Sequence, residues 1–489
     1  MNKRIRPWQR IIVLAIGSMV LAVFAPTVVQ AAGSANLPAG AETITKLQVS
    51  IDTIWVLITG FLVFFMQAGF AMLEAGFSQQ KGVVNALIEN FIDAAVTILV
   101  WWAVGFGIAY GTSAGGLLGI DTFFLSQLPN SDGVYPMDVP GSTAAINNYT
   151  LFFFQFAFAA TASTITTGSM LGRTDFIGNL IYSSVMGAFS YPIIVHWAWN
   201  VEGWLSKLSY HDFAGSSVVH CVGGWTALVG AYLLGPRPGR PPWGSPPPAH
   251  NLGLATLGTM ILWFGWYGFN SGSTLGASNT GLIGLVTVNT TLAGGAAALA
   301  AIIYQYIRTS KWHLDYCLNG ALSGLVAITA ACAYVAPWAA VLIGLTAGIL
   351  LVTGINLIES LQIDDPVSAF SVHGINGMMG SLSIGFLGQA ELTLNKKAGL
   401  LLGGGIELLG IQLLGVVAIA VFTVAFSFLM FGSLRAMGRL RVHPEGDRLG
   451  IDVYEHGASV WPDVYSVEKL VEDKKDYPKS SDVSTFENE

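Results

Sequence analysis

The chain has 489 residues, of which 53% are hydrophobic and only 10% charged, and its formal net charge is -7. A typical soluble domain carries roughly 25% charged residues, so this composition excludes an ordinary soluble protein and indicates a polytopic membrane protein. The net negative charge is concentrated in predicted loops and in the C-terminal end, and it gives no support to nucleic-acid binding.

The first 32 residues have the order of a secretory signal peptide. Four basic residues lie among the first ten, an apolar run covers residues 11–24, and small residues follow at 31–32. The run is shorter than the roughly 20 residues that a spanning helix needs. We therefore predict a signal peptide over 1–32 that is removed on maturation. The alternative is an additional first membrane helix.

Eleven later segments are long and apolar enough to span a bilayer, which predicts an all-α membrane domain over residues 33–438. They are 53–73, 86–110, 149–171, 177–197, 213–234, 252–272, 280–307, 317–334, 338–358, 367–387 and 401–434. Residues 439–489 change character and end in a charged, Ser-containing stretch, which predicts a C-terminal tail that is partly disordered.

Basic residues in the loops predict the orientation. With the mature N-terminus outside, only four lysines lie in exterior loops, and the larger set of Lys and Arg lies in cytoplasmic connections. The cytoplasmic set is Lys81, Arg173, Arg237, Arg240, Arg308, Lys311, Arg435, Arg439 and Arg441. The positive-inside rule then places the tail in the cytoplasm. Localisation in the plasma membrane agrees with the predicted signal peptide.

The order of the segments predicts an internal duplication. Five spans in the first half are an odd number, so a repeat that begins at the sixth span is inverted in the membrane. Gly69-Phe70 in the first span and Gly268-Phe269 in the sixth fit such a repeat. We predict two inverted five-helix halves followed by a long final helix, with a binding region between the halves.

Two segments carry the same polar pattern inside otherwise apolar spans. In DFAGSSVVHCVGG, Asp212 is followed by His220 at an offset of 8 residues and by Gly224 at an offset of 12. In DDPVSAFSVHGING, Asp365 is followed by His373 and Gly377 at the same offsets. Ionisable groups in membrane helices are costly and by default mark a pathway for an ion or polar substrate.

These motifs resemble those of the ammonium transporter (Amt/Mep/Rh) family. The segment from Asp212 to the Gly-Pro-Arg at 235–237 resembles the family's signature, and DDPVSAFSVHG resembles its second histidine segment. The similarity extends from about residue 52 to 457, and it includes the Gly450, Asp452 and His456 pattern of the cytoplasmic tail. After Gly457 the sequence departs from the family pattern.

The resemblance implies a set of pore residues. His220 and His373 match the twin histidines of the pore, Phe158, Trp199, Phe269 and Ser273 match the exterior vestibule and gate, and Asp212 matches a residue near the outer recruitment site. Aromatic faces attract cations by about 0.5–2 kcal/mol. The alternatives are structural: the aromatic residues form an ordinary interfacial belt, and Asp212 and Asp365 are helix N-caps.

We therefore expect conduction of ammonium, ammonia and methylammonium for nitrogen uptake, by a homotrimer with one pore in each subunit and no cofactor. A PII-type regulator is an expected partner at the cytoplasmic face. An ammonium sensor that signals through its tail is the alternative, and a metalloenzyme using His220, His373 and Asp212 is a third hypothesis that no ligand spacing supports. Glu74, Glu89 and Asp93 are expected to have structural roles.

Overall fold

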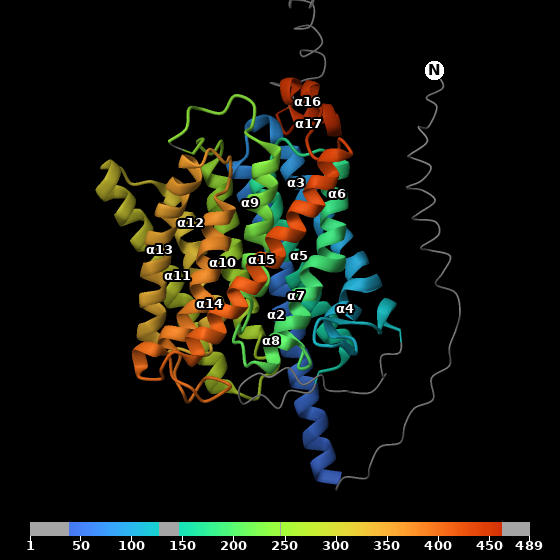
Figure 1. Ribbon diagram of the computed structural model, residues 1–489, viewed down its shortest axis with the longest axis vertical. Coiled ribbons are helices and arrows are strands. Elements are labelled where there is room, and N and C mark those ends of the chain that lie inside the picture. The colour runs from blue at the N-terminus through green and yellow to red at the C-terminus, as the bar shows by residue number, and fades with distance from the viewer. Residues whose placement is uncertain (1–38, 127–145, 245, 462–489) are drawn as a thin grey trace, which may run out of the picture. The chain divides into compact units, whose positions relative to one another are not determined.

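The computed structural model describes residues 39–126, 146–244 and 246–461, with side chains from residue 46 onward. The described chain is mostly helical, and its helices lie side by side in one bundle (Figure 1). The predicted signal peptide and the last part of the predicted tail lie outside the described residues.

Ten helical segments in the described part of the chain are long and apolar enough to cross a membrane. They are Lys46–Phe77, Gln80–Tyr110, Asn148–Met170, Phe176–Lys207, Ser216–Leu234, Leu252–Gly272, Thr280–Thr309, Leu314–Ala331, Pro337–Ser360 and Glu407–Ala436. The segment predicted at 367–387 is helical as η6 (Phe370–Ile375) and α14 (Asn376–Leu387). Polar residues and glycine lower its mean hydropathy, so it is not among the ten, and the count of eleven stays a prediction.

The labels of these helices follow chain order in Figure 1. The remaining bounds are α2 (Ala39–Phe77), η1 (Gln80–Gly82), α3 (Val83–Val100), η2 (Trp101–Gly105), α4 (Phe106–Tyr110), α5 (Asn148–Met170), α6 (Phe176–Val185), η4 (Met186–Ser190), α7 (Tyr191–Trp199), α8 (Trp204–Lys207), η5 (Ser216–Cys221), α9 (Val222–Leu234), α10 (Leu252–Gly272), α11 (Thr280–Thr309), α12 (Leu314–Ala331), α13 (Pro337–Ser360) and α15 (Glu407–Ala436).

Short elements complete the described chain. They are a hairpin of two short strands, β1 (Ser113–Ala114) and β2 (Leu118–Gly119), the turns η3 (Phe123–Leu125) and η7 (Leu400–Leu402), and the tail helices α16 (Pro444–Leu449) and α17 (Ile451–His456). The tail helices lie at one end of the bundle and α8 lies at the other (Figure 1). A charged tail that contacts only one end of the bundle can act there without entering a membrane-spanning path.

The first helices of the two predicted inverted repeats, α2 and α10, cross with reciprocal contacts. Gly69 on α2 approaches Leu262 on α10, and Gly268 on α10 approaches Leu62 on α2. A methyl group added at either glycine would lie within 2.8 Å of its neighbour. Glycine is therefore needed for this close crossing, as is usual where membrane helices pack.

The two histidine-bearing segments show the same reciprocity. A Cβ atom at Gly224 would lie 2.3 Å from the backbone nitrogen of Gly374, and one at Gly377 would lie 2.4 Å from the carbonyl oxygen of Ser216. These two glycines are the residues at offset 12 from the aspartates. Their close approach explains why glycine stands at the same place in both repeats, and it brings the two histidine segments together.

Both histidine segments begin with a π-helical turn where the sequence predicts a continuous helix. Residue 213 was the expected start of the fifth span, but the helix begins at Ser216, after Gly215 with φ of 116°. The tenth segment starts at Phe370 rather than 367. Wide turns of this kind often occur at functional sites, and in both segments the histidine lies within the wide turn.

Candidate functional site

His220 and His373 meet in the interior of the bundle. Their Nδ1 atoms are 3.2 Å apart, and their rings stack with centroids 5.2 Å apart at 26°. Both side chains are buried. A neutral imidazole has one donor and one acceptor nitrogen, so one ring donates across this contact and the other accepts. Such a pair can receive a proton and pass it from ring to ring.

Two aromatic rings of α10 cover His220. Its ring stacks on Trp266 at 5.1 Å and on Phe269 at 5.5 Å between centroids. Phe269 in turn stacks on Phe158 at 4.0 Å, and Phe158 meets the ring of Trp199 edge-on at 6.1 Å. The rings form one continuous series from Trp199 to the histidines. The stacked rings of Phe158 and Phe269 lie in the middle of this series, between Trp199 and His220.

A pocket lies at the Trp199 end of this series. Phe158, Trp199 and Ser273 all line it, together with four further residues, Phe154, Gln155, Phe213 and Leu275. The Ser273 hydroxyl donates to the carbonyl oxygen of Phe269 at 2.8 Å, which leaves the hydroxyl oxygen able to accept a hydrogen bond. The residues predicted for a vestibule and gate are thus brought together in one place.

Asp212 lies immediately behind this pocket and caps η5. Its two carboxylate oxygens accept hydrogen bonds from four backbone N–H groups, those of Gly215, Ser216, Ser217 and Val218, at 2.7–3.0 Å. The Ser217 hydroxyl donates a fifth. Burial raises the pKa of Asp212, but these donors all favour the ionised form. The cap thus keeps an anion close to Trp199, whose indole N–H donates to the Asp212 carbonyl at 2.7 Å.

Asp365 has the equivalent position in the second repeat. It accepts hydrogen bonds from the backbone N–H groups of Ala369 and Phe370 at 2.9 Å and from the Ser169 hydroxyl at 2.7 Å. Both aspartates therefore hold the start of a histidine-bearing segment in place. The cap and a fixed negative charge are compatible in one side chain.

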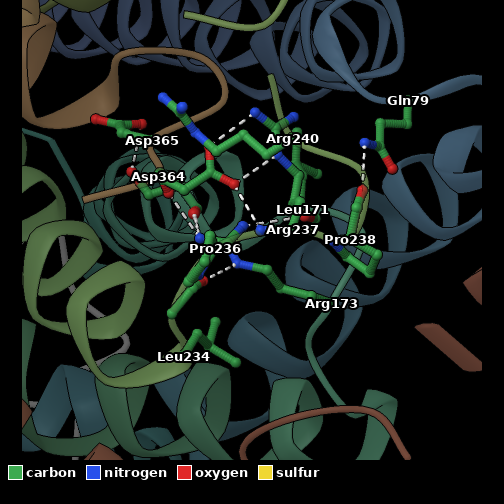
Figure 2. A network of polar contacts seen from close by, with 12 residues as sticks. Gln79, Leu171, Arg173, Leu234, Pro236, Arg237, Pro238, Arg240, Asp364 and Asp365 are labelled. Carbon is green, nitrogen blue, oxygen red and sulfur yellow. Dashed lines mark hydrogen bonds and ion pairs between the residues drawn. The ribbon is translucent and has the colours of Figure 1, made fainter. Parts of the chain in front are cut away.

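The neighbouring residue, Asp364, is the centre of a buried ion-pair network that the sequence analysis did not single out. Figure 2 shows three arginines, Arg173, Arg237 and Arg240, converging on it. Arg237 donates to its carboxylate from the backbone N–H at 2.8 Å and from the guanidinium at 2.9 Å. Arg240 adds a bond at 3.3 Å, and Arg173 donates to its carbonyl oxygen at 2.7 Å.

This network fastens the two histidine segments to each other. Arg237 follows the end of α9, which continues the His220 segment, and Asp364 precedes the start of η6, which carries His373. Burial alone would raise the pKa of Asp364, but the bonds and charges of Arg237 and Arg173 lower it well below its usual range. The Asp-Asp pair in the sequence and the Gly-Pro-Arg after the first segment are the signals that could have found it.

The C-terminal tail docks on the start of α3. The carboxylate of Asp452 accepts hydrogen bonds from the backbone N–H groups of Val84 and Asn85 at 2.9 and 2.8 Å. His456 Nε2 lies 2.9 Å from Asn85 Oδ1. Asp452 and His456, both named in the sequence pattern, therefore help to hold the tail against the membrane domain, together with Arg439 and Arg441.

Metal binding finds no geometric support in the part of the chain that the structure describes. No group of three or more His, Cys, Asp or Glu side chains there could hold an ion. Asp212, which the metalloenzyme hypothesis requires as a ligand, is already surrounded by five donors. The carboxylate is used as a cap, and the two histidines contact each other instead.

Known proteins of one family are similar to this chain over most of its length. Residues 54–461 match the model of the Ammonium Transporter Family. Ammonium transporter Amt2 of Archaeoglobus fulgidus is 39% identical over 473 residues, which cover 93% of this chain and 97% of that protein. A putative ammonium transporter of Synechocystis is 39% identical over 440 residues, with coverage of 87% and 92%.

Solved structures show a similar fold. A structure described as a sensor Amt protein has a TM-score of 0.77 and 39% identity, and the match covers 84% of this chain and 100% of that one. The Candida albicans Mep2 structure has a TM-score of 0.75 and 26% identity, with coverage of 86% and 93%. The chain belongs to the ammonium transporter family and is a multi-pass membrane protein.

Proposed function

We propose that the chain conducts ammonium, ammonia and methylammonium across the plasma membrane through a hydrophobic pore centred on His220 and His373. The observation that carries the proposal is the 3.2 Å contact between the two Nδ1 atoms, buried behind a series of stacked rings. A charged ammonium ion is too costly to carry through such a path. Ammonia, after loss of a proton, is neutral and small.

Recruitment of the ion takes place at the pocket lined by Phe158, Trp199 and Ser273. The faces of the two rings attract a cation, and the Ser273 oxygen accepts one of its hydrogens. Asp212 lies behind Trp199 and contributes a fixed negative charge. Together these groups replace part of the hydration shell before the ion reaches the gate.

Phe158 and Phe269 form the gate. Their stacked rings touch at 4.0 Å between centroids, so at least one ring must rotate for a molecule to pass. Potassium has nearly the size of ammonium, and a sieve cannot separate the two ions. Ammonium can donate directed hydrogen bonds and can release a proton to a histidine, whereas potassium can do neither.

Assembly as a homotrimer is supported by a groove on α2, α3 and α5. It is lined mainly by apolar side chains, among which phenylalanines at 61, 64, 65, 91, 153 and 156 are prominent. Such a surface faces either lipid or another subunit in a membrane, and we assign it to the subunit contact of the proposed trimer. In the proposed orientation the mature N-terminus lies outside, and the docked tail faces the cytoplasm, where a PII-type regulator could reach it.

An ammonium sensor is the second candidate function. Two observations favour it: the tail is docked through Asp452 and His456 on the membrane domain, and the similar solved structure is described as a sensor. A sensor binds ammonium but moves little of it. Uptake of radiolabelled methylammonium into vesicles that contain the purified protein separates the two functions.

The histidine pair supplies the test of the pore. Replacing either histidine with alanine leaves the other without its partner and opens space for water, so His220→Ala and His373→Ala should each weaken discrimination of ammonium from potassium. The double variant should be little worse, because the two rings act as one unit. Ammonium and potassium fluxes are measured in vesicles for all four proteins, with folding checked independently. Unchanged selectivity in both single variants would mean that the histidines are only core residues.

A further inference from the structure

A small cavity lies beside the histidine pair and is lined by a carboxyl group. His373 and Glu74 both border it, together with Asn319. All three side chains are buried. The cavity offers about 10 Å³ to the centre of a water molecule, which is enough space for one water molecule. The Asn319 Oδ1 atom is buried and accepts no hydrogen bond from any described residue. A water molecule in this cavity would satisfy that oxygen.

Among the residues that the structure describes, Glu74 has no cation as a hydrogen-bond partner. Its oxygens accept from Asn90 Nδ2 at 2.7 Å and from the Thr167 hydroxyl at 2.9 and 3.0 Å, and both partners are neutral. The side chain is 1% exposed and lies on the membrane-spanning helix α2. A carboxylate in such a place is costly unless a cation or a proton compensates its charge. A purely structural hydrogen-bond acceptor would not need to be an acid.

We propose that Glu74 is the proton acceptor of the pore and receives, through one water molecule, the proton that ammonium leaves on the histidine pair. This inference rests on the proposed transport function. In the step, an ammonium N–H bond breaks and an N–H bond forms on the histidine pair, which releases neutral ammonia. The imidazolium then gives a proton to the water, and the water gives one of its own to a Glu74 oxygen. The histidines return to neutrality, and the acid holds the proton apart from the ammonia.

A polar stripe on α3 offers the proton a way onward. Asn85, Glu89, Asp93 and Thr97 recur every four residues and so share one face of the helix. All four are buried, and both carboxyl oxygens of Glu89 and the Asn85 amide nitrogen lack hydrogen-bond partners among the described residues. Water molecules would satisfy these atoms. The stripe runs along α3 from Thr97 to Asn85. Asn85 lies at the start of the helix, where His456 of the tail contacts it.

The test is to measure charge and ammonia separately in vesicles that contain the full-length protein. Ammonium pulses on a solid-supported membrane give the charge moved, and a chemical assay of the total ammonium and ammonia trapped inside the vesicles gives the amount of ammonia that enters. Glu74→Gln preserves the shape of the side chain but cannot take up a proton, so the charge moved per ammonia should fall by about 100-fold. Glu74→Asp should keep part of it. Glu391→Gln, which changes an exposed acid, serves as the matched control and should behave as wild type.

An infrared measurement gives a readout other than flux. Adding ammonium to wild type should produce a protonated carboxyl band that shifts in D2O and is missing in Glu74→Gln. If that variant does not fold, Asn319→Leu fills the cavity while it keeps the acid, and it should lower the charge per ammonia in the same way.

The outcomes separate this inference from the proposed function. The role of Glu74 would be overturned if Glu74→Gln moved as much charge per ammonia as wild type does. The same result in Asn319→Leu decides the matter if only that variant folds. In both cases the proposed transport function would remain intact. Ammonia entry without any charge in wild type would also overturn the role of Glu74. A wild-type protein that moves neither ammonium nor methylammonium would overturn the proposed function itself, and the inference with it.

Discussion

The ion pair between Arg237 and Asp364 is expected to stabilise the membrane domain strongly, and Arg237→Met tests this. The change keeps the length and apolar stem of the side chain but removes its charge and its donors. Both partners are almost fully buried, with side-chain exposures of 2% and 1%. The variant therefore leaves a carboxylate inside the protein with fewer partners, while its surroundings stay closed to water.

The expected loss in the free energy of unfolding depends on the partners that Asp364 keeps in the variant. Breaking a buried ion pair by removing one partner costs about 3–5 kcal/mol. Arg240 still donates to Asp364 at 3.3 Å, so we expect a loss near the lower end, about 3 kcal/mol. The pKa of Asp364 is lowered in the folded state, so the contribution is complete at neutral pH and is lost only as the pH falls below about 4 and through the folded-state value.

The assay is equilibrium unfolding of the purified protein in mixed micelles, followed by circular dichroism at pH 7. Wild type, Arg237→Met, Asp364→Asn and the double variant form a cycle, in which the coupling free energy should be about 1–3 kcal/mol because the residues are in contact. Arg435→Met alters an exposed arginine and should stay within about 0.5 kcal/mol of wild type. An Arg237→Met protein as stable as that control would refute the reasoning.

Three further changes have defined expectations. Asp212→Ala removes both the cap of η5 and the charge behind Trp199, so methylammonium uptake should be crippled in protein that still reaches the membrane, and full uptake would contradict the role of this acid. Deleting residues after about Leu440 should change transport rate or regulation but not ion preference, because the described tail contacts only one end of the bundle; altered potassium permeability in vesicles would argue against it. Burial lowers the pKa of His211 to about 4 from the ordinary 6.5, so the neutral ring stabilises the fold above about pH 6.5, and about 3 kcal/mol should be lost as the pH falls to about 4. Unfolding of wild type and His211→Gln across this pH range checks the last expectation, since the variant should show a flatter dependence.

Much of the fold is encoded in features that a single sequence displays. The span predicted at 252–272 has the same bounds as α10 (Leu252–Gly272), because polar loop residues flank a long apolar run. The repeat of Asp, His and Gly at equal offsets predicted that two segments share a polar face, and the structure brings His220 and His373 into contact. Periodic patterns report local geometry and burial well.

Other features depend on tertiary contacts that local patterns do not encode. The wide turns η5 and η6 follow Asp212 and Asp365, whose carboxylates each gather several N–H groups, and apolar periodicity reveals neither feature. The pairing of Arg237 with Asp364 joins residues separated by 127 positions. The docking of Asp452 on the start of α3 likewise joins distant segments. In each case the residue types were visible, but their partners were not.

The arrangement of the site bears on how one pore could distinguish two ions of equal size. In the proposed pore, the stacked rings of Phe158 and Phe269 lie between the outer pocket and His220 and exclude a hydrated ion. An ion that must keep its charge would pay the full cost of desolvation there. Ammonium can avoid this cost, since deprotonation converts it to a neutral molecule, provided that the proton has somewhere to go. The histidine pair cannot take up a second proton until it has lost the first. An acceptor beside His373 would remove the first proton and make the step repeatable. Selectivity in this scheme comes from chemistry, and it requires that the histidines stay in contact. We expect the caps at Asp212 and Asp365 and the buried ion pair at Asp364 to help maintain that contact, because they hold the two histidine segments in place, so damage to any of them should reduce selectivity before it abolishes folding.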